Sequence, residues 1–227
     1  MKTKLMVIKD RIGAEAVKLI QSGMIVGLGS GSTAAYFIKH LARRCKEGLD
    51  IQAVSSSEKS TQLASHLKIP LIPIDTIESV DLTIDGADQI NPAKQMIKGL
   101  GGALVREKIL AHMSREMVII VDESKLVPQL GKLLPTEIIP FAHMATLSQL
   151  KRLGYHGEWR KKPDGSYFIS DNHNFILDIR FDHPIENPLH DHEKIISLPG
   201  VVETGFFFNL AGRIIIGFLD GQIITRE

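Results

Sequence analysis

Short apolar segments alternate with helical patterns through the first 122 residues, and this alternation most restricts the possible folds. Most of the apolar segments are followed by a polar loop and then by apolar residues at helical spacing. Such a repeat predicts an open, mainly parallel sheet with helices on both faces, which is an α/β fold of the Rossmann-like kind. The predicted strands cover residues 24–28, 51–54, 71–74, 82–84 and 117–121.

Polar clusters stand at the ends of the predicted strands. They contain hydroxyls, carboxylates and a lysine, and they cover residues 30–33, 55–57, 85–88 and 122–125. In open α/β sheets, ligands bind just beyond the carboxyl ends of the strands. We therefore expect a ligand site at this edge of the sheet.

A different pattern follows residue 132. It predicts a small α+β module with the order β-α-β-β-α-β, as in split βαβ, ferredoxin-like folds. Its strands are expected at 137–141, 158–161, 174–181 and 201–208, and its helices at 144–153 and 190–197. A further strand at 213–218 is expected to return to the first sheet. The predicted domains are therefore 1–131 plus 209–227, which form the Rossmann-like body, and an inserted module, 132–208.

Composition limits the possible partners and compartment. The net charge of +1 provides no overall field for nucleic acid or for an anionic membrane. Cys45 is the only cysteine, which excludes an internal disulfide and fits a reducing compartment. The N-terminus has no long apolar segment, and no apolar run approaches the length of a membrane span. We expect a cytoplasmic protein without nucleic-acid or membrane partners.

The loop from Gly29 to Thr33 suits a phosphate, since it combines backbone N–H groups, three hydroxyls and a predicted helix start. It lacks the Lys-Ser/Thr pair of a Walker A loop. It also lacks the third glycine of the dinucleotide pattern, because Ser32 and Ala34 stand at the two candidate positions. By itself the loop is as consistent with a tight turn capped by a serine as with a phosphate site.

Residues 85–107 combine acids, an amine and a flexible turn. Asp85 and Asp88 could form a solvated turn, and a metal would need ligands that the sequence does not place beside them. Lys98 precedes the glycine-rich turn 99–102, where a lysine can place its charge on an oxyanion. Glu107 could be an exposed helix residue or a proton-transfer group. Together they indicate a site that moves a proton and stabilises the resulting negative charge.

A second possible metal site is His190 and His192 beside Asp191, but no further ligands stand at useful spacing. We interpret this stretch as a helix start with solvated side chains. The sequence therefore predicts no bound metal.

Several segments together resemble the type A ribose-5-phosphate isomerases. In the order of that family they are VGLGSGSTAAYFI, SSSEKSTQLA, DLTIDGADQI, MIKGLGGALVREKI, VDESKLVPQLGK, DNHNFILDI and LPGVVETGFF. The resemblance implies a Rossmann-like domain with a small α+β domain, a homodimer or a dimer of dimers, and no metal or nucleotide cofactor. It also implies interconversion of D-ribose 5-phosphate and D-ribulose 5-phosphate through a cis-enediol(ate), in the non-oxidative branch of the pentose phosphate pathway.

The resemblance also implies residue roles. Glu107 matches the catalytic base, Asp85 the acid that opens the furanose ring, and Lys98 the group that stabilises the enediolate. Asp88 matches a residue that binds sugar hydroxyls. The full set of implied substrate-binding residues is Ser30, Gly31, Ser32, Thr33, Asp85, Gly86, Ala87, Asp88, Lys98, Gly99, Leu100, Gly101, Lys125 and Lys9. The phosphate is expected at the hydroxyl loop, with the last two lysines near it.

The chain departs from the family pattern at three positions. Leu100 interrupts the run of glycines after the lysine, and we expect it to narrow the pocket. His173 replaces a glycine in the small domain, and Leu210 replaces an arginine after the last strand of that domain.

The alternative from another functional class is a non-catalytic, sugar-phosphate-sensing domain of the same general fold. Such domains commonly accompany a DNA-binding helical head, which the N-terminal residues do not predict. Amino-sugar phosphate deaminases and lactonases share the architecture as well. Turnover of ribose 5-phosphate to a ketose distinguishes the three.

Overall fold

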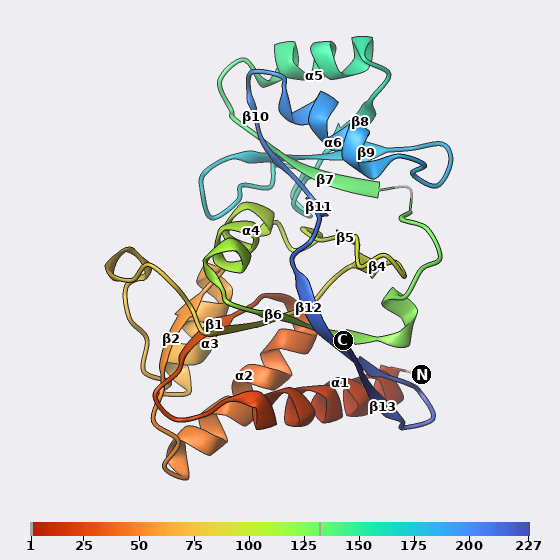
Figure 1. Cartoon of the computed structure of the whole chain (residues 1–227). Coiled ribbons are helices and arrows are strands. Elements are labelled where there is room, and N and C mark those ends of the chain that lie inside the picture. The colour runs from red at the N-terminus through yellow and green to blue at the C-terminus, as the bar shows by residue number, and fades with distance from the viewer. Residues whose placement is uncertain (1, 132) are drawn as a thin grey trace. The chain divides into compact units, whose positions relative to one another are not determined.

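The computed structural model describes residues 2–131 and 133–227 of the chain. Contacts between residues divide it into two units, each with its own sheet system (Figure 1). Unit 1 consists of Met1–Ala87, Arg106–Leu126 and Leu210–Glu227, and unit 2 consists of Asp88–Val105 and Val127–Asn209. No helix among the described residues is long and apolar enough to cross a membrane.

Unit 1 is built on a six-stranded sheet of order β13-β12-β6-β3-β1-β2. The pairs from β12 to β2 are all parallel, and the edge strand β13 runs antiparallel to β12. This confirms the predicted α/β fold with a mainly parallel sheet. The strands are β1 (Ile25–Leu28), β2 (Gln52–Ser55), β3 (Leu82–Asp85), β6 (Met117–Asp122), β12 (Ala211–Gly217) and β13 (Ile223–Arg226).

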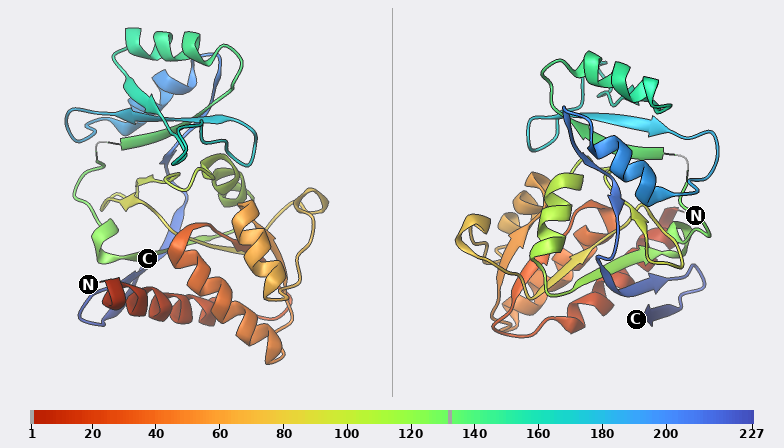
Figure 2. Two further views of the ribbon diagram at one scale, coloured as in Figure 1. Left: turned by 180° about the vertical axis from the view of Figure 1, so that it is seen from behind. Right: turned by 45° about the horizontal axis from the view of Figure 1, so that its top comes forward.

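Helices cover both faces of this sheet (Figure 2). One face carries the larger apolar cluster, which α1, α2 and α3 share with the strands, and the other face packs against α4. The helices are α1 (Lys2–Ala16), α2 (Gly31–Lys46), α3 (Glu58–His66) and α4 (Leu104–Met113).

The alternation of side chains along β3 places its last residue on the α4 face. Leu82 and Ile84 belong to the larger apolar cluster on the opposite face. Thr83 points the other way, and its hydroxyl lies 2.6 Å from that of Ser114, directly after α4. Since successive strand residues face opposite ways, Asp85 shares the α4 face with Thr83.

The predicted strand 71–74 is wrong. Leu71 forms a single isolated bridge to Ala53, and a 3-10 helix follows at Ile74–Thr76. Pro70 and Pro73 explain the difference, because proline has no N–H to donate to a strand ladder.

Unit 2 contains a four-stranded antiparallel sheet of order β10-β7-β9-β8. Its elements follow one another as β-α-β-β-α-β, which confirms the predicted split βαβ order. They are β7 (Leu133–Ile138), α5 (His143–Arg152), β8 (His156–Trp159), β9 (Phe175–Arg180), α6 (Pro188–Ile196) and β10 (Val201–Thr204).

A three-stranded sheet of order β11-β5-β4 completes unit 2. Its strands have two residues each: β4 (Gln89–Ile90), β5 (Met96–Ile97) and β11 (Phe206–Phe207). The pairing of β5 with β11 connects the segment 88–105 to the end of unit 2.

The predicted domain limits stay a prediction, and the two units differ from them at three places. Residues 88–105, 127–131 and 209 are predicted in the larger domain, whereas their contacts place them in unit 2. The predicted first residue of the small domain, Lys132, lies outside the described residues.

His173 offers a test of backbone strain in unit 2. Its φ is +63°, in the left-handed region, where a non-glycine residue pays roughly 1–2 kcal/mol. We expect His173→Gly to raise the free energy of unfolding by about 0.5–1 kcal/mol, since the greater freedom of glycine in the unfolded chain offsets part of the gain. Denaturant unfolding measures this change.

His183→Gly is the matched control, because His183 is exposed and lies outside the left-handed region. It should lower the free energy of unfolding slightly through the entropy of the unfolded chain. Equal effects of the two substitutions would contradict the strain argument.

Candidate active site

The order in which the chain adds strands to the unit 1 sheet reverses between β1 and β3. From β1 it passes to β2 on one side, and it later returns to β3 and β6 on the other side. Ligands of open α/β sheets bind at such a switch point, beyond the carboxyl ends of the strands. Gly29 and Ser30 follow β1, and Asp85 is the last residue of β3, with Gly86 directly after it. Predicted site residues therefore lie where this architecture places a ligand.

Asp85 is held by the backbone on both sides of the switch point. Its Oδ1 accepts hydrogen bonds from the N–H of Ser30 (2.9 Å) and the N–H of Gly86 (2.7 Å). A Cβ added to Gly29 would lie 2.5 Å from the Asp85 Cα, so only glycine allows this close approach. Although Asp85 is only 1% exposed, these contacts keep its carboxylate hydrogen-bonded.

Glu107 lies on the buried stripe of α4, between Leu104 and Leu110 at spacings of three residues. It is 4% exposed, and its Oε1 accepts a short hydrogen bond from the Ser30 hydroxyl. Ser30 therefore contacts both acids, through its N–H to Asp85 and through its hydroxyl to Glu107. The interpretation of Glu107 as an exposed helix residue is excluded.

The hydroxyl loop forms the N-terminus of α2. Ser30 is the N-cap residue, and Gly31 begins the helix with a φ of +87°. Lys9 of α1 donates to the Ser32 hydroxyl over 2.8 Å, and Thr33 is buried. A helix N-terminus favours anions through its N–H groups and its dipole, and the ammonium adds a positive charge.

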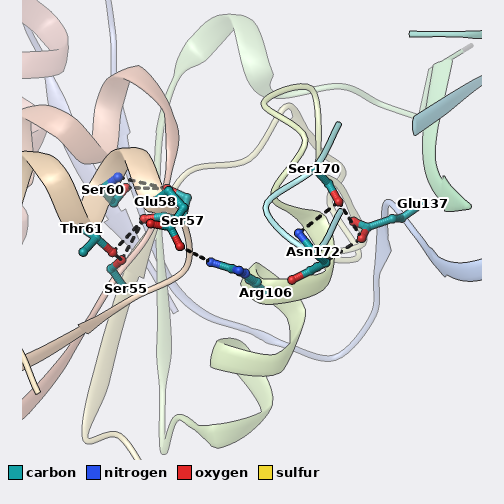
Figure 3. A network of polar contacts seen from close by, with 9 residues as sticks. All are labelled: Ser55, Ser57, Glu58, Ser60, Thr61, Arg106, Glu137, Ser170 and Asn172. Atoms are coloured by element: carbon teal, nitrogen blue, oxygen red, sulfur yellow. Dashed lines mark hydrogen bonds and ion pairs between the residues drawn. The ribbon is translucent and has the colours of Figure 1, made fainter. Parts of the chain in front are cut away.

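The serines that follow β2 form a hydrogen-bonded cluster (Figure 3). The Ser57 hydroxyl accepts from the Ser60 N–H and caps α3, while the Ser60 hydroxyl donates to the Gly29 carbonyl over 2.8 Å. Arg106 directly precedes Glu107 in the chain. It forms an ion pair with Glu58 at 3.0 Å, which connects α4 to α3. The sequence predicts this polar cluster at the edge of the sheet where ligands bind. In the structure its side chains hold the backbone of the loop and the neighbouring helices in place.

Lys125 lies beyond the end of β6, the neighbour of β3. The Asp122 carboxylate accepts from the Ser124 N–H at 3.1 Å and caps a 3-10 helix, Glu123–Lys125. Because β3 and β6 are parallel neighbours, this helix starts at the same edge of the sheet as the acids. Lys125 is half-buried there.

Lys98 belongs to unit 2 and follows β5 directly. It is 2% exposed, its N–H donates to the Gly205 carbonyl over 2.9 Å, and its Nζ lies 5.5 Å from the centroid of the Phe207 ring. Lysine side chains are rarely buried, and surface lysines normally keep their ammonium in water. Lys98 is therefore not an ordinary solvated surface lysine.

The glycine-rich turn after Lys98 is also ordered within unit 2. Gly99 and Gly102 have φ values of +102° and +84°, and the Gly102 N–H donates to the Gly99 carbonyl over 2.9 Å. The Leu100 N–H donates to Oδ2 of Asp88 over 2.9 Å. Asp88 therefore holds this turn with one of its carboxylate oxygens. The Leu100 side chain is exposed.

The predicted site residues thus fall into two groups, one on each unit. Unit 1 carries Lys9, Ser30, Gly31, Ser32, Thr33, Asp85, Gly86, Ala87, Glu107 and Lys125, and unit 2 carries Asp88, Lys98, Gly99, Leu100 and Gly101. One residue that the sequence did not indicate is Arg160, which contacts the carbonyls of the glycine-rich turn. No periodicity or motif marks it, because the contact joins segments about 60 residues apart.

The histidines of the possible second metal site have other contacts. The His190 N–H donates to the Asn187 side chain, which caps α6, and His192 Nδ1 lies 2.8 Å from the Thr204 hydroxyl. His192 is half-buried, so the prediction that its side chain is solvated is wrong. Within residues 2–131 and 133–227, no group of three or more histidines, cysteines or acids could hold a metal ion.

Together the fold and the unit 1 residues place two buried acids, Asp85 and Glu107, at the edge of the sheet where α/β enzymes bind their ligands. The family model described as ribose 5-phosphate isomerase A (phosphoriboisomerase A) matches residues 52–221. The ribose-5-phosphate isomerase A of Protochlamydia amoebophila is 51% identical to this chain over 94% of the chain and 93% of the relative.

Solved structures agree with this match. Ribose 5-phosphate isomerase A of Methanocaldococcus jannaschii has a TM-score of 0.90 at 36% identity, over 97% of this chain and 98% of that chain. A D-ribose-5-phosphate isomerase in complex with phospho-erythronic acid has a TM-score of 0.91 at 36% identity, over 97% of both chains. The chain belongs to the ribose 5-phosphate isomerase A family and is an isomerase, as the resemblance predicted.

Proposed function

We propose that the chain interconverts D-ribose 5-phosphate and D-ribulose 5-phosphate through a cis-enediol(ate), with Glu107 as the base. One observation carries the proposal: a buried carboxylate at the switch point, oriented by a serine that also holds Asp85. The related isomerase that binds phospho-erythronic acid supports a phosphorylated sugar as the ligand.

Glu107 removes the proton from C2 of the open-chain aldose. The electron pair of the C–H bond forms the C1–C2 double bond, and the carbonyl electrons move to the oxygen on C1. The same carboxyl group returns the proton to C1, while the proton of the hydroxyl on C2 passes to the oxygen on C1, so that C2 becomes the ketone and C1 carries the hydroxyl. A single carboxylate can make both transfers, because C1 and C2 are adjacent carbons within reach of one base.

Asp85 assists ring opening before this transfer. Its Oδ1 is occupied by two backbone N–H groups, which fix the orientation of the carboxyl group. Opening the furanose requires a proton to move between the anomeric hydroxyl and the ring oxygen, which a fixed carboxyl group can mediate. Asp88, whose Oδ2 accepts from the glycine-rich turn, binds sugar hydroxyls with its remaining capacity as an acceptor.

The phosphate binds at the N-terminus of α2, at Ser30–Thr33. This site offers backbone N–H groups, hydroxyls and the ammonium of Lys9, and Lys125 lies at the same edge of the sheet. Since the phosphate is remote from C1 and C2, its binding energy serves to orient the reacting carbons.

Lys98 neutralises the charge that develops on the substrate oxygen. Its ammonium is buried and lies near an aromatic ring, an environment of low polarity in which a positive charge acts strongly on a nearby anion. The Leu100 N–H donates to Asp88, and the N–H groups of Gly99 and Gly101 on either side of it supply donors to the substrate.

We further propose that the chain works as a homodimer in the cytoplasm and requires no metal or nucleotide. The single cysteine supports a reducing compartment, and the family resemblance supports the dimer. A sedimentation experiment that finds only monomers at micromolar concentration would contradict the dimer, and loss of activity in EDTA would contradict the absence of a metal.

The decisive experiment incubates the protein with D-ribose 5-phosphate and follows ketose formation. An isomerase produces D-ribulose 5-phosphate, and in D₂O it introduces deuterium into the product or the returned substrate. A sensor domain would bind the sugar phosphate without turnover, and a deaminase would instead release ammonia from an amino-sugar phosphate. Either of these results, without ketose formation, would contradict the proposal.

A further inference from the structure

Arg160 connects an ion pair in the small sheet to the glycine-rich turn after Lys98. The residue directly follows β8. Its Nε donates to Oδ2 of Asp178 over 2.9 Å, and its Nη2 makes a short bond to Oδ1 of the same carboxylate. Its Nη1 donates to the carbonyls of both Gly99 and Leu100, each over 2.9 Å. One planar guanidinium thus joins a carboxylate to two successive peptides.

Burial and backbone hydrogen bonds fix the position of the Arg160 side chain. The side chains of Arg160 and Asp178 are only 13% and 18% exposed, so neither is free to sample solvent. The Arg160 N–H donates to the Ile176 carbonyl over 2.8 Å, and its carbonyl accepts from the Phe168 N–H over 2.9 Å. A side chain anchored in this way can impose its geometry on a glycine-rich partner, which has little conformational preference of its own.

The two carbonyl contacts determine the direction of the N–H groups in the turn. In a trans peptide the C=O and the following N–H point in opposite directions. Since the Gly99 carbonyl points at Arg160, the Leu100 N–H points away, and it meets Asp88. The Leu100 carbonyl also points at Arg160, so the Gly101 N–H is directed away from the guanidinium as well.

Phe168 restrains the other end of the same turn. Its ring lies where a side chain at Gly102 would be, since an added Cβ would come within 2.4 Å of the ring. The Arg160 guanidinium carbon is 5.8 Å from the centroid of this ring. Arginine and phenylalanine therefore hold Gly99 and Gly102, the two residues of the turn with left-handed φ values.

We infer that Arg160 is a positioning residue for the isomerisation: it holds the 99–101 peptides so that the Gly101 N–H, together with the adjacent Lys98, stabilises the anionic intermediate. This inference rests on the proposed function. A purely structural ion pair would need only the two nitrogens that bind Asp178, Nε and Nη2. The third nitrogen, Nη1, donates to two carbonyls of the glycine-rich turn. The guanidinium charge also polarises these peptides, which strengthens their N–H groups as donors.

The first test compares Arg160→Ala and Arg160→Lys with a matched control, Arg180→Ala. Arg180 pairs with Glu158 across the same two strands, but both side chains are largely exposed. We expect Arg160→Ala to lower kcat about 10–100-fold, the range of one lost orienting contact, with a change in KM below about threefold. Arg160→Lys, which keeps the charge but loses the fork, should fall between it and wild type. The control should stay within about twofold of wild type.

Added guanidinium ion, at concentrations well below those that unfold the protein, should partly restore the kcat of Arg160→Ala and leave Arg180→Ala unchanged. A role limited to stability would not respond to the added ion. Equal kcat values for the Arg160→Ala and Arg180→Ala variants, or a loss confined to KM, would overturn the inference.

Amide hydrogen exchange supplies a readout that does not depend on turnover. The Leu100 and Gly102 amides should exchange about tenfold or more faster in Arg160→Ala than in wild type or the control, with Arg160→Lys between them, because Arg160 no longer holds the turn that carries both amides. Unchanged exchange would overturn the inference, even if the wild type is a fully active isomerase. Faster exchange in a protein without activity on ribose 5-phosphate would instead contradict the proposed function and support the control of the turn by Arg160.

Discussion

Glu107→Gln lowers kcat for D-ribose 5-phosphate by about 10²–10⁴-fold if this carboxylate is the base, which is the usual contribution of general base catalysis. Glutamine keeps the shape of the side chain but cannot take up the C2 proton. Its carbonyl oxygen can still accept from the Ser30 hydroxyl, so the contact that orients residue 107 survives. The measurement is the initial rate of ketose formation at saturating substrate, together with deuterium uptake from D₂O.

Both signals should fall together, because one carboxyl group removes and returns the proton. The fold should be retained, since a neutral amide at a position that is 4% exposed carries no greater desolvation cost than a carboxylate. Glu15→Gln is the control: this acid forms an exposed pair with Lys18 on α1, and its loss should leave kcat unchanged. A Glu107→Gln variant with near wild-type turnover would remove Glu107 from the mechanism.

The body of the fold was predictable because its signals are local. Strands β1, β2, β3 and β6 are short apolar runs that precede polar residues, and a parallel sheet brings such ends to one edge. The switch point follows from the same order. It brings Ser30 and Asp85 into contact, although 55 residues separate them.

The spacing of Glu107 along its helix predicts burial, although its charge alone suggests exposure. It stands three residues after Leu104 and three before Leu110, so it occupies an apolar position in the buried stripe of α4. An acid at such a position is rare without a hydrogen-bonding partner, and Ser30 provides one here. The pattern could therefore have favoured burial over a solvated helix face.

Other features could not be predicted because they depend on long-range contacts. The strands β4, β5 and β11 have two residues each, too few for any periodicity, yet they place the segment 88–105 in unit 2. The two carbonyl contacts of Arg160 likewise involve backbone atoms, which carry no sequence signal. Local proline chemistry, in contrast, would have excluded a strand at 71–74.

Lys98→Met should lower kcat by about 10²–10³-fold, which corresponds to roughly 3–4 kcal/mol of lost transition-state stabilisation. Methionine approximates the length of the lysine side chain and can pack against the Phe207 ring, so the substitution removes the charge with little loss of volume. Since the negative charge on the oxygen develops during the reaction, kcat and kcat/KM should fall by similar factors.

Lys151→Met is the control for this substitution. Lys151 lies on α5 of the same unit and is exposed, so the loss of its charge should change neither kcat nor the free energy of unfolding appreciably. Thermal unfolding of the Lys98→Met variant checks that the fold is retained, so that a loss of kcat can be assigned to the missing charge. A stable Lys98→Met variant with unchanged kcat would mean that another donor stabilises the enediolate oxygen. A variant that lost affinity alone would assign Lys98 to ground-state binding.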